Sequence, residues 1–261
     1  PNEIAAVLEQ HPAVRKAVVI LHPDHDNPQF VAYVVLDPIH SPSIAGRQRY
    51  KLPNELAVVH LNRNETDFLY EEMFEVQAYF KHGISLRDGD CVFDVGANIG
   101  LFSLSAHLRA RDLKIHLFEP SPVVFDLLKT NMQLYSVDAH LHPAGVSREK
   151  KTMPLTFYPK FSFLSGVYAD TDDDKEVVRS FVRKHKGNGH SNGNGHGIAE
   201  SELLEELLDD RFESREIEVN LVTLSDMIRE HNVRQVDLLK INVEKSEMDV
   251  LAGIEEDDWS R

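Results

Sequence analysis

The chain has 261 residues and a formal net charge of −15 at pH 7, with 28 Lys and Arg against 43 Asp and Glu. This acidic excess argues against a nucleic-acid backbone as partner, because phosphate binding needs clustered cations. Cys91 is the single cysteine, which excludes an intrachain disulfide and a thiolate metal site. No apolar run approaches the ~18 residues of a membrane span, and no signal peptide opens the chain. We therefore expect no membrane partner and a cytoplasmic protein.

The first 38 residues are expected to form one helix and two strands. Residues 3–10 carry apolar side chains at helical spacing, whereas residues 15–21 and 30–36 are rich in Val and have the composition of strands. A segment this short cannot bury a sufficient core of its own. Because the chain begins with Pro1 rather than with a methionine, we expect it to be a piece of a longer polypeptide.

Four short stretches of this segment recur together in a known subdomain: Asn2-Glu3-Ile4-Ala5-Ala6-Val7-Leu8, His11-Pro12-Ala13-Val14, Ala17-Val18-Val19 and Phe30-Val31-Ala32-Tyr33-Val34-Val35. They resemble the C-terminal subdomain of the adenylation domains of nonribosomal peptide synthetases. The resemblance implies an adenylation domain in cis and a carrier-protein assembly line. The later part of that subdomain, which holds the family's catalytic lysine, does not occur in this sequence. The segment should therefore not adenylate a substrate.

A second unit is predicted over residues 52–261, after a linker at residues 39–51 that contains Pro, Ser and Gly. Residues 56–59 are apolar and predict a short strand. A helix is expected over residues 68–82, where apolar side chains recur on one face. Gly83 then ends this helix.

Residues 92–102 are the centre of this unit. Apolar residues run into Asp94 and then into a glycine-containing turn, after which an amphipathic helix begins. This pattern predicts a buried parallel strand that feeds a loop at a helix N-terminus. Gly96 and Gly100 allow the backbone to turn sharply and leave room for a ligand. The first N–H groups of the helix lack intrahelical partners and should face that ligand.

A second acid follows the next predicted strand, at residues 114–118. Glu119 lies 25 residues after Asp94, where an acid can hold ribose hydroxyls. A nicotinamide-binding loop would favour G-x-G-x-x-G beneath a pyrophosphate, but this loop is D-x-G-x-x-x-G. Asp94 and Asn98 would repel or poorly cradle a pyrophosphate, which favours a nucleoside with a cationic tail such as S-adenosylmethionine. An α/β turn that binds nothing is the remaining alternative.

The rest of the chain continues the alternation of strands and helices, with one interruption. Residues 187–198 are rich in Gly, Asn and His and predict a flexible insertion. His185, His190 and His196 could form a metal-binding tract, but nothing there fixes a geometry, so we interpret the insertion as a solvated tether. The predicted strands are 139–146, 152–158 at a sheet edge, 216–224 and 236–244, and the predicted helices are 121–135, 170–186, 200–210, 225–231 with Ser225 as its cap, and 245–254.

Lys240 lies inside a predicted central strand whose other residues are mostly apolar. A buried parallel strand is normally a continuous apolar run. A lysine in such a strand therefore indicates either a functional site or a buried ion pair. Asn242 and Glu244 stand at the carboxyl end of the same strand, where ligands bind in α/β sheets.

Seven groups of residues in the second unit recur together in one family: Asn64-Glu65-Thr66 with Phe68-Leu69-Tyr70, Tyr79-Phe80-Lys81-His82-Gly83-Ile84, residues 92–102, Phe118-Glu119-Pro120, Phe157-Tyr158-Pro159, Ser165-Gly166 and residues 238–244. They resemble the FkbM-type S-adenosylmethionine-dependent methyltransferases, in particular versions embedded in peptide- and polyketide-synthase proteins. The resemblance implies an α/β, Rossmann-like class I fold with a mostly parallel sheet. It also implies S-adenosylmethionine as cofactor and a hydroxyl group as acceptor.

Two features depart from the family's pattern. Family members more often carry Asp where this chain has Asn242, and an amide there weakens a role as base or metal ligand. The sequence also stops at Arg261, where such folds normally continue. We therefore expect the C-terminal strands of the sheet to be missing from this sequence.

Methyl transfer to an alcohol needs alignment and a group that removes the proton. Each candidate has a structural alternative, since His82 could end a helix, Glu244 could begin one, and aromatic residues could pack over the sheet. Asp94, Asn242 and Glu244 could hold Mg²⁺ through oxygen atoms, but no pattern fixes such a site and we predict no metal. The candidates are His82, Lys240 and Glu244 for catalysis; Asp94, Gly96, Asn98, Gly100, Glu119 and Asn242 for the cofactor; and Tyr79, Phe163, Ser165 and Tyr168 for the substrate.

The predicted function is O-methylation of a peptide or polyketide intermediate bound to a peptidyl or acyl carrier protein, in natural-product biosynthesis. Two alternatives remain open. A nicotinamide-dependent ketoreductase would need a pyrophosphate-binding loop and a Tyr-x-x-x-Lys pair, which this sequence lacks. A truncated, non-catalytic remnant that serves as an interaction module is the other.

Overall fold

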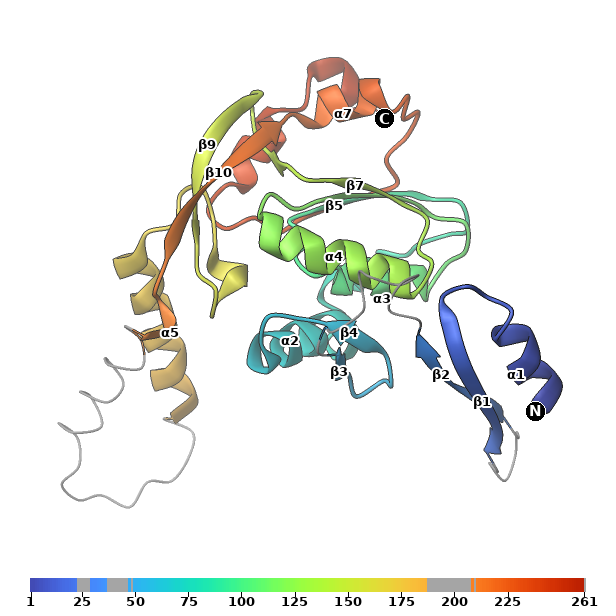
Figure 1. Ribbon diagram of the computed structural model, residues 1–261. Helices are drawn as coiled ribbons and strands as arrows, with labels where there is room; N and C mark the ends of the chain where they lie inside the picture. Colours follow the sequence, from blue (N-terminus) through green and yellow to red (C-terminus); the bar gives the residue numbers. More distant parts are fainter. Residues whose placement is uncertain (23–28, 37–46, 48, 187–207, 209, 261) are drawn as a thin grey trace, which may run out of the picture. The chain divides into compact units, whose positions relative to one another are not determined.

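The computed structural model describes residues 1–22, 29–36, 47, 49–186, 208 and 210–260, which form two compact units, Pro1–Arg49 and Tyr50–Arg261 (Figure 1). The boundary falls within the predicted linker at 39–51. Most of that linker, the insertion at 187–198 with His190 and His196, and most of the helix expected at 200–210 lie outside the described residues.

The first unit contains helix α1 (Asn2–Leu8) and an antiparallel pair of strands, β1 (Val14–His22) and β2 (Gln29–Leu36). Ala17 and Val19, two residues apart on β1, are buried. Side chains two residues apart point to the same face of a strand, so the face of β1 that carries Ala17 and Val19 is the buried one. The helix and both strands expected from the sequence are confirmed.

A four-stranded parallel sheet forms the centre of the second unit. Its strands are β5 (Cys91–Val95), β6 (Lys114–Phe118), β7 (Ala139–His142) and β11 (Leu238–Ile241), in the order β11-β5-β6-β7. Every neighbouring pair runs parallel. The carboxyl ends of all four strands therefore meet at one edge, and the expected parallel α/β sheet is confirmed.

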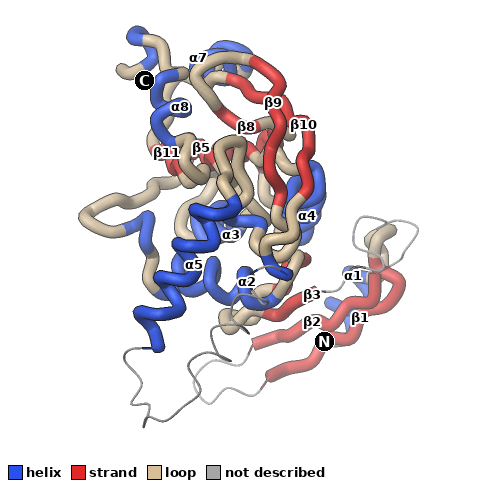
Figure 2. The backbone as a smooth tube through the Cα atoms, turned by 90° about the vertical axis from the view of Figure 1, so that its left-hand side faces the viewer, coloured by secondary structure: helices blue, strands red, loops and turns tan. Residues whose placement is uncertain are grey.

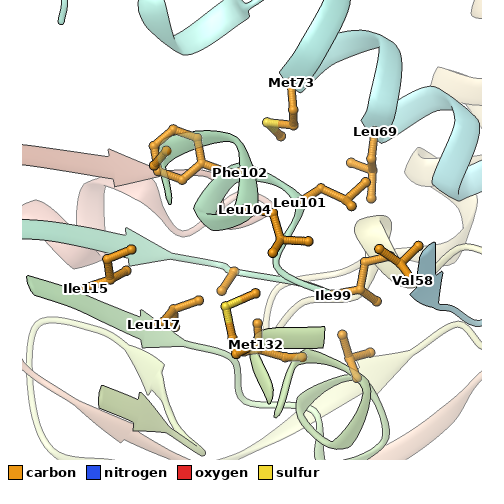
Figure 3. Close-up of a cluster of buried hydrophobic side chains, with 14 of the residues drawn as sticks. Val58, Leu69, Met73, Ile99, Leu101, Phe102, Leu104, Ile115, Leu117 and Met132 are labelled. Atoms are coloured by element: carbon orange, nitrogen blue, oxygen red, sulfur yellow. The ribbon is translucent and has the colours of Figure 1, made fainter. Parts of the chain in front are cut away.

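Helices cover both faces of this sheet (Figure 1). Helices α3 (Leu101–His107) and α4 (Pro122–Leu134) pack against one face in a core that includes Leu117 of β6 (Figure 3). Helix α7 (Leu224–Glu230) packs against the other face in a core that includes Phe93 of β5. Two apolar layers thus hold the strands that position the glycine loop.

A second, three-stranded sheet has the order β8-β10-β9, formed by β8 (Gly145–Val146), β9 (Lys151–Phe157) and β10 (Arg215–Val222). Strands β9 and β10 run side by side and antiparallel (Figure 2). The single strand predicted over 139–146 is wrong, because the chain leaves the parallel sheet after β7. Ala144 donates to the His142 carbonyl (2.8 Å), which closes a tight turn around a proline that has no N–H to pair.

The helix predicted over 68–82 is also wrong. Helix α2 spans Arg63–Tyr70 and continues as a π-helical turn, η1 (Glu71–Glu75), before a separate 3-10 turn, η2 (Ala78–Phe80). Gln77 between them has a φ of 52°, in the left-handed region, which stops the helix. Asn62 caps α2 by accepting from the Glu65 N–H (2.9 Å), so the helix begins at Arg63.

Thr223 rather than Ser225 caps α7, since the Thr223 hydroxyl accepts from the Asp226 N–H (3.0 Å). In the described part of the chain, no helix is long and apolar enough to cross a membrane. The remaining elements are β3 (Arg49–Lys51), β4 (Ala57–Val59), α5 (Thr171–Lys186), α8 (Glu247–Ala252) and the 3-10 turns η3 (Ser162–Leu164) and η4 (Glu256–Asp258).

Candidate active site

A cavity opens where β5, β6 and β11 end. Its empty volume is about 970 Å³, part of which is open to solvent. Its walls come from the glycine loop, the residues after β6 and β11, and the loop around η3. Ligands of open α/β sheets bind at this edge. The cavity brings together eight of the predicted site residues: Gly96, Asn98, Glu119, Phe163, Ser165, Lys240, Asn242 and Glu244.

The two loop glycines are required by the packing of the chain itself. Gly96 has a φ of 76°, and a Cβ there would lie 2.0 Å from the backbone oxygen of Asn242. Gly100 has a φ of 89°, and its Cβ would lie 2.5 Å from Met132 and 2.7 Å from Leu128. The prediction that both glycines leave room for a ligand is therefore corrected. Gly96 borders the cavity, whereas Gly100 lets α3 pack closely against α4.

Glu119 fastens the glycine loop to the end of β6. Its carboxylate accepts from the Asn98 N–H (3.1 Å) and from the Ser121 N–H (2.9 Å). Burial raises the pKa of Glu119 to about 7, although both N–H groups and the positive charge of Lys240 oppose this shift. The acid predicted to hold ribose hydroxyls thus borders the cavity and titrates near neutral pH.

Asp94 and Lys240 form a buried ion pair beneath the loop. Nζ of Lys240 lies 2.9 Å from Oδ1 of Asp94, and both side chains are almost fully buried. The Ser103 hydroxyl also donates to Asp94 (2.7 Å), and Lys240 donates to the Gly96 carbonyl (2.6 Å). Asp94 does not line the cavity, and its predicted role as a cofactor ligand stays a prediction. These contacts let Lys240 support the loop from beneath, while its catalytic role stays a prediction.

A polar network that the sequence analysis did not identify as part of the site joins α2 to the loop. Glu65 is buried and accepts from the Ser162 N–H (3.0 Å). The Asn98 amide donates to the Ser162 hydroxyl (3.2 Å), and Asn98 has a φ of 49°. The sequence holds one signal for this network: Asn62 and Glu65 have the spacing of a capping box, which marks Glu65 as a residue with a fixed orientation.

Three predicted residues form the opposite wall of the cavity. Phe163 stacks with Phe68 (5.6 Å between ring centroids), and the Ser165 hydroxyl accepts from the Tyr158 N–H (3.0 Å). Glu244 also borders the cavity, and burial raises its pKa, with a smaller contribution from nearby acids. A carboxylate with a raised pKa inside a cavity is suited to accept a proton from a bound alcohol.

Tyr79 does not line the cavity. Burial raises the pKa of Tyr79. Its ring contacts Phe102 edge-on (5.4 Å between centroids) and lies 5.9 Å from Nζ of Lys240. Its predicted contact with substrate stays a prediction.

His82 and Tyr168 lie away from the cavity. His82 is exposed, follows η2 and has a φ of 57°, which matches the helix-ending alternative considered for it. Tyr168 is 42% exposed, and its hydroxyl donates to Asp249 (2.6 Å). Neither lines the cavity, so the structure does not bring them together with the other predicted site residues. The Mg²⁺ alternative also loses a ligand, because Asp94 is committed to Lys240.

A parallel sheet of this order, with a glycine loop after β5 and a buried acid after β6, is a Rossmann-like α/β fold. The family model described as the methyltransferase FkbM domain matches residues 94–261. The chain belongs to the FkbM methyltransferase family.

Three curated relatives are similar to the chain. The 31-O-demethyl-FK506 methyltransferase FkbM of Streptomyces tacrolimicus is 42% identical over 81% of this chain and 77% of its own. The AMB antimetabolite synthetase AmbE of Pseudomonas aeruginosa is 33% identical over 98% of this chain but 12% of its own. Methyltransferase 1 of Beauveria bassiana is 32% identical over 75% of this chain and 70% of its own.

Proposed function

We propose that the second unit binds S-adenosylmethionine in the cavity and methylates a hydroxyl group of an acyl intermediate carried by a peptidyl or acyl carrier protein. The observation that carries this proposal is the buried Glu119 carboxylate at the rim of the glycine loop. Membership of a methyltransferase family favours this function over the nicotinamide-dependent alternative.

The residues around Glu119 fit the proposed cofactor. Ser121 is buried and borders the cavity, and its Oγ has no hydrogen-bond partner among the described residues. A buried hydroxyl without a partner is unfavourable, so a ligand hydroxyl beside it would satisfy both groups. Glu119 and Ser121 would hold the ribose, and the glycine loop at Gly96 and Asn98 would hold the amino-acid tail.

The chemistry expected of the protein is alignment and proton removal. S-adenosylmethionine, when bound, supplies a methyl group on a sulfonium sulfur. This sulfur is a good leaving group because it departs as a neutral thioether. Glu244 is the proposed base, because it borders the cavity and its pKa is raised by burial. Lys240 keeps the loop in place through the Gly96 carbonyl. Phe163, in the η3 turn, lines the cavity and would border the acceptor.

Two relatives support the proposed acceptor. One is named for a 31-O-demethyl substrate, which favours an oxygen acceptor. The other is named as a synthetase and aligns with 98% of this chain, including the first unit. A carrier tethered within such an assembly would deliver its acyl group at high effective concentration, so weak intrinsic affinity would suffice. The net charge of −15 argues that an acidic carrier is not recognised by broad electrostatic attraction.

Calorimetry with S-adenosylhomocysteine tests the cofactor assignment. Glu119→Ala should weaken binding by about 1–3 kcal/mol, because polar groups of the ligand lose their partner. Glu218→Ala, on the exposed surface of β10, is the matched control and should bind like the wild type. Equal binding by all three proteins would refute the assignment, and nicotinamide fluorescence quenching on titration would favour the ketoreductase.

Comparison of a carrier-loaded hydroxyacyl group with the same group free in solution tests the acceptor. We expect efficient methyl transfer only to the carrier-loaded form. Equal transfer to the free molecule would refute delivery by a carrier while leaving the methyltransferase intact. Cofactor binding without transfer to any carrier-loaded hydroxyl would support the non-catalytic alternative.

A further inference from the structure

Four histidines gather on the α7 side of the parallel sheet. His116 belongs to β6, His140 and His142 belong to β7, and His231 directly follows α7. Leu141 packs with the core on the opposite face of the sheet. Since side chains alternate along a strand, both β7 histidines point toward α7. None of the four lines the cavity.

The ring nitrogens converge on one point. One ring nitrogen from each of His116, His142 and His231 can be chosen so that all three lie within 4.8 Å of one another. Nδ1 of His116 and Nε2 of His142 are 3.2 Å apart, and His231 meets His142 edge-on, with 4.9 Å between ring centroids. His140 is exposed and stacks on His116 at 4.6 Å. These distances allow a single ion to contact three imidazoles after small side-chain rotations.

The surroundings of the cluster favour neutral imidazoles. Phe93 packs against His116 and Phe118 stacks on His142, with ring centroids 4.7 and 4.5 Å apart. Neutral imidazole is the form that binds metals. Three such ligands suit Zn²⁺, Ni²⁺ or Cu²⁺, and the oxygen ligands preferred by Mg²⁺ do not take part.

We propose that His116, His142 and His231 bind a divalent transition-metal ion, of which Zn²⁺ is the example to test, with His140 beside the open coordination position. The ion joins three separate segments and ties the end of α7 to the β7 edge of the sheet. The His142 carbonyl accepts from the Glu119 N–H (3.2 Å), so this site also supports the strand end that carries Glu119. The role is structural and does not depend on the proposed methyl transfer.

Calorimetric titration of the metal-free full chain with ZnCl₂ tests the proposal. We expect one ion per chain and a melting temperature that rises with zinc, because an ion that binds the folded state stabilises it. His231→Gln and His142→Gln should each weaken zinc binding about tenfold or more and reduce the shift in melting temperature. His107→Gln, an exposed histidine at the end of α3, is the matched control and should bind zinc like the wild type.

Two further measurements keep the proposal open to refutation. Circular dichroism of each variant without metal separates loss of ligand from loss of fold, and a variant with the wild-type spectrum that still binds zinc with full affinity would overturn the site. The double variant His190→Gln/His196→Gln removes two histidines of the glycine-rich insertion. We expect it to retain zinc binding. If it loses binding while His231→Gln keeps it, zinc binds the insertion and the proposal is wrong.

Discussion

The two sides of the cavity are built differently. On the cofactor side, Asp94, Lys240 and Glu119 are buried and hydrogen-bonded to the glycine loop or to each other. On the acceptor side, Phe163 and Glu244 come from segments far apart in the sequence: Phe163 lies in the η3 turn and Glu244 on the loop after β11. The cofactor side is continuous with the core of the sheet, whereas the acceptor side is added to it.

Because of this difference, mutations on the two sides of the cavity should have different effects. A change on the cofactor side disturbs groups that also hold the fold, so it should alter stability together with binding. A change on the acceptor side removes groups from loops positioned by a rigid scaffold, so it should alter transfer and leave the fold intact. The predictions below test this division.

The largest expected effect is on the acceptor side. Glu244→Gln keeps the size of the side chain but removes the proposed base, so methyl transfer should fall by about 10²–10⁴-fold. S-adenosylhomocysteine affinity and the melting temperature should stay at their wild-type values. Glu256→Gln, in the exposed η4 turn, is the control. If Glu244→Gln transfers methyl groups at the wild-type rate, Glu244 is not the base.

The next effect is on the cofactor side. Lys240→Met leaves the Asp94 carboxylate buried without its counter-ion, which should lower the free energy of unfolding by about 3–5 kcal/mol. Urea denaturation measures this change. The comparison variant is Arg229→Met, which breaks exposed pairs with Asp226 (2.7 Å) and Glu255 (2.8 Å) and should lower stability by no more than about 1 kcal/mol. Similar losses in the two variants would show that the buried pair does not stabilise the fold.

Local patterns located the glycine loop and the acid that lies against it at the edge of the sheet, while cofactor binding there stays a prediction. The D-x-G-x-x-x-G loop and the acid after the next strand are each continuous stretches, and the structure places Glu119 against that loop. The packing of Gly96 against Asn242 joins residues far apart in the chain, and no local pattern reports such a contact. The same holds for the Ser162 contact with Glu65.

The histidine cluster shows the same limit. His140 and His142 have the two-residue spacing that places both on one face of a strand, which is a signal the sequence does contain. The approach of His231 from the end of α7 depends on how that helix packs across the sheet. From the sequence, histidine metal binding was considered only for the glycine-rich insertion, and no metal was predicted. The three-dimensional cluster could not be foreseen because its histidines come from three separate elements.

A smaller effect should appear in the pH dependence of cofactor binding. Burial raises the pKa of Glu119 from its ordinary 4.5 to about 7, so the folded protein holds an extra proton between these values and loses stability as the pH rises through this window. Ribose hydroxyls donate to the ionised carboxylate. The affinity for S-adenosylhomocysteine should therefore rise about tenfold from pH 6 to pH 8. Calorimetry at both values measures it.

Glu119→Gln supplies the control for this pH dependence. The amide keeps an oxygen that can accept from Asn98 or Ser121, but it does not titrate. Its affinity should be lower than that of the wild type at pH 8 and equal at the two pH values. A variant that keeps the wild-type slope would assign the pH dependence to a different group.

The smallest effect concerns Ser121, the residue on the cofactor side whose buried hydroxyl has no partner among the described residues. Ser121→Ala removes this unsatisfied group, so the ligand-free protein should be as stable as the wild type or more stable by up to about 1 kcal/mol. The affinity for S-adenosylhomocysteine should fall by about 0.5–1.5 kcal/mol, the net contribution of one hydrogen bond. Thermal unfolding and calorimetry on the same preparation separate the two effects. Ser103→Ala is the matched comparison. Its hydroxyl already donates to Asp94 (2.7 Å), so this variant should be less stable than the wild type, in contrast to Ser121→Ala. If Ser121→Ala loses stability and keeps its affinity for S-adenosylhomocysteine, the Ser121 hydroxyl stabilises the fold and does not bind the ribose.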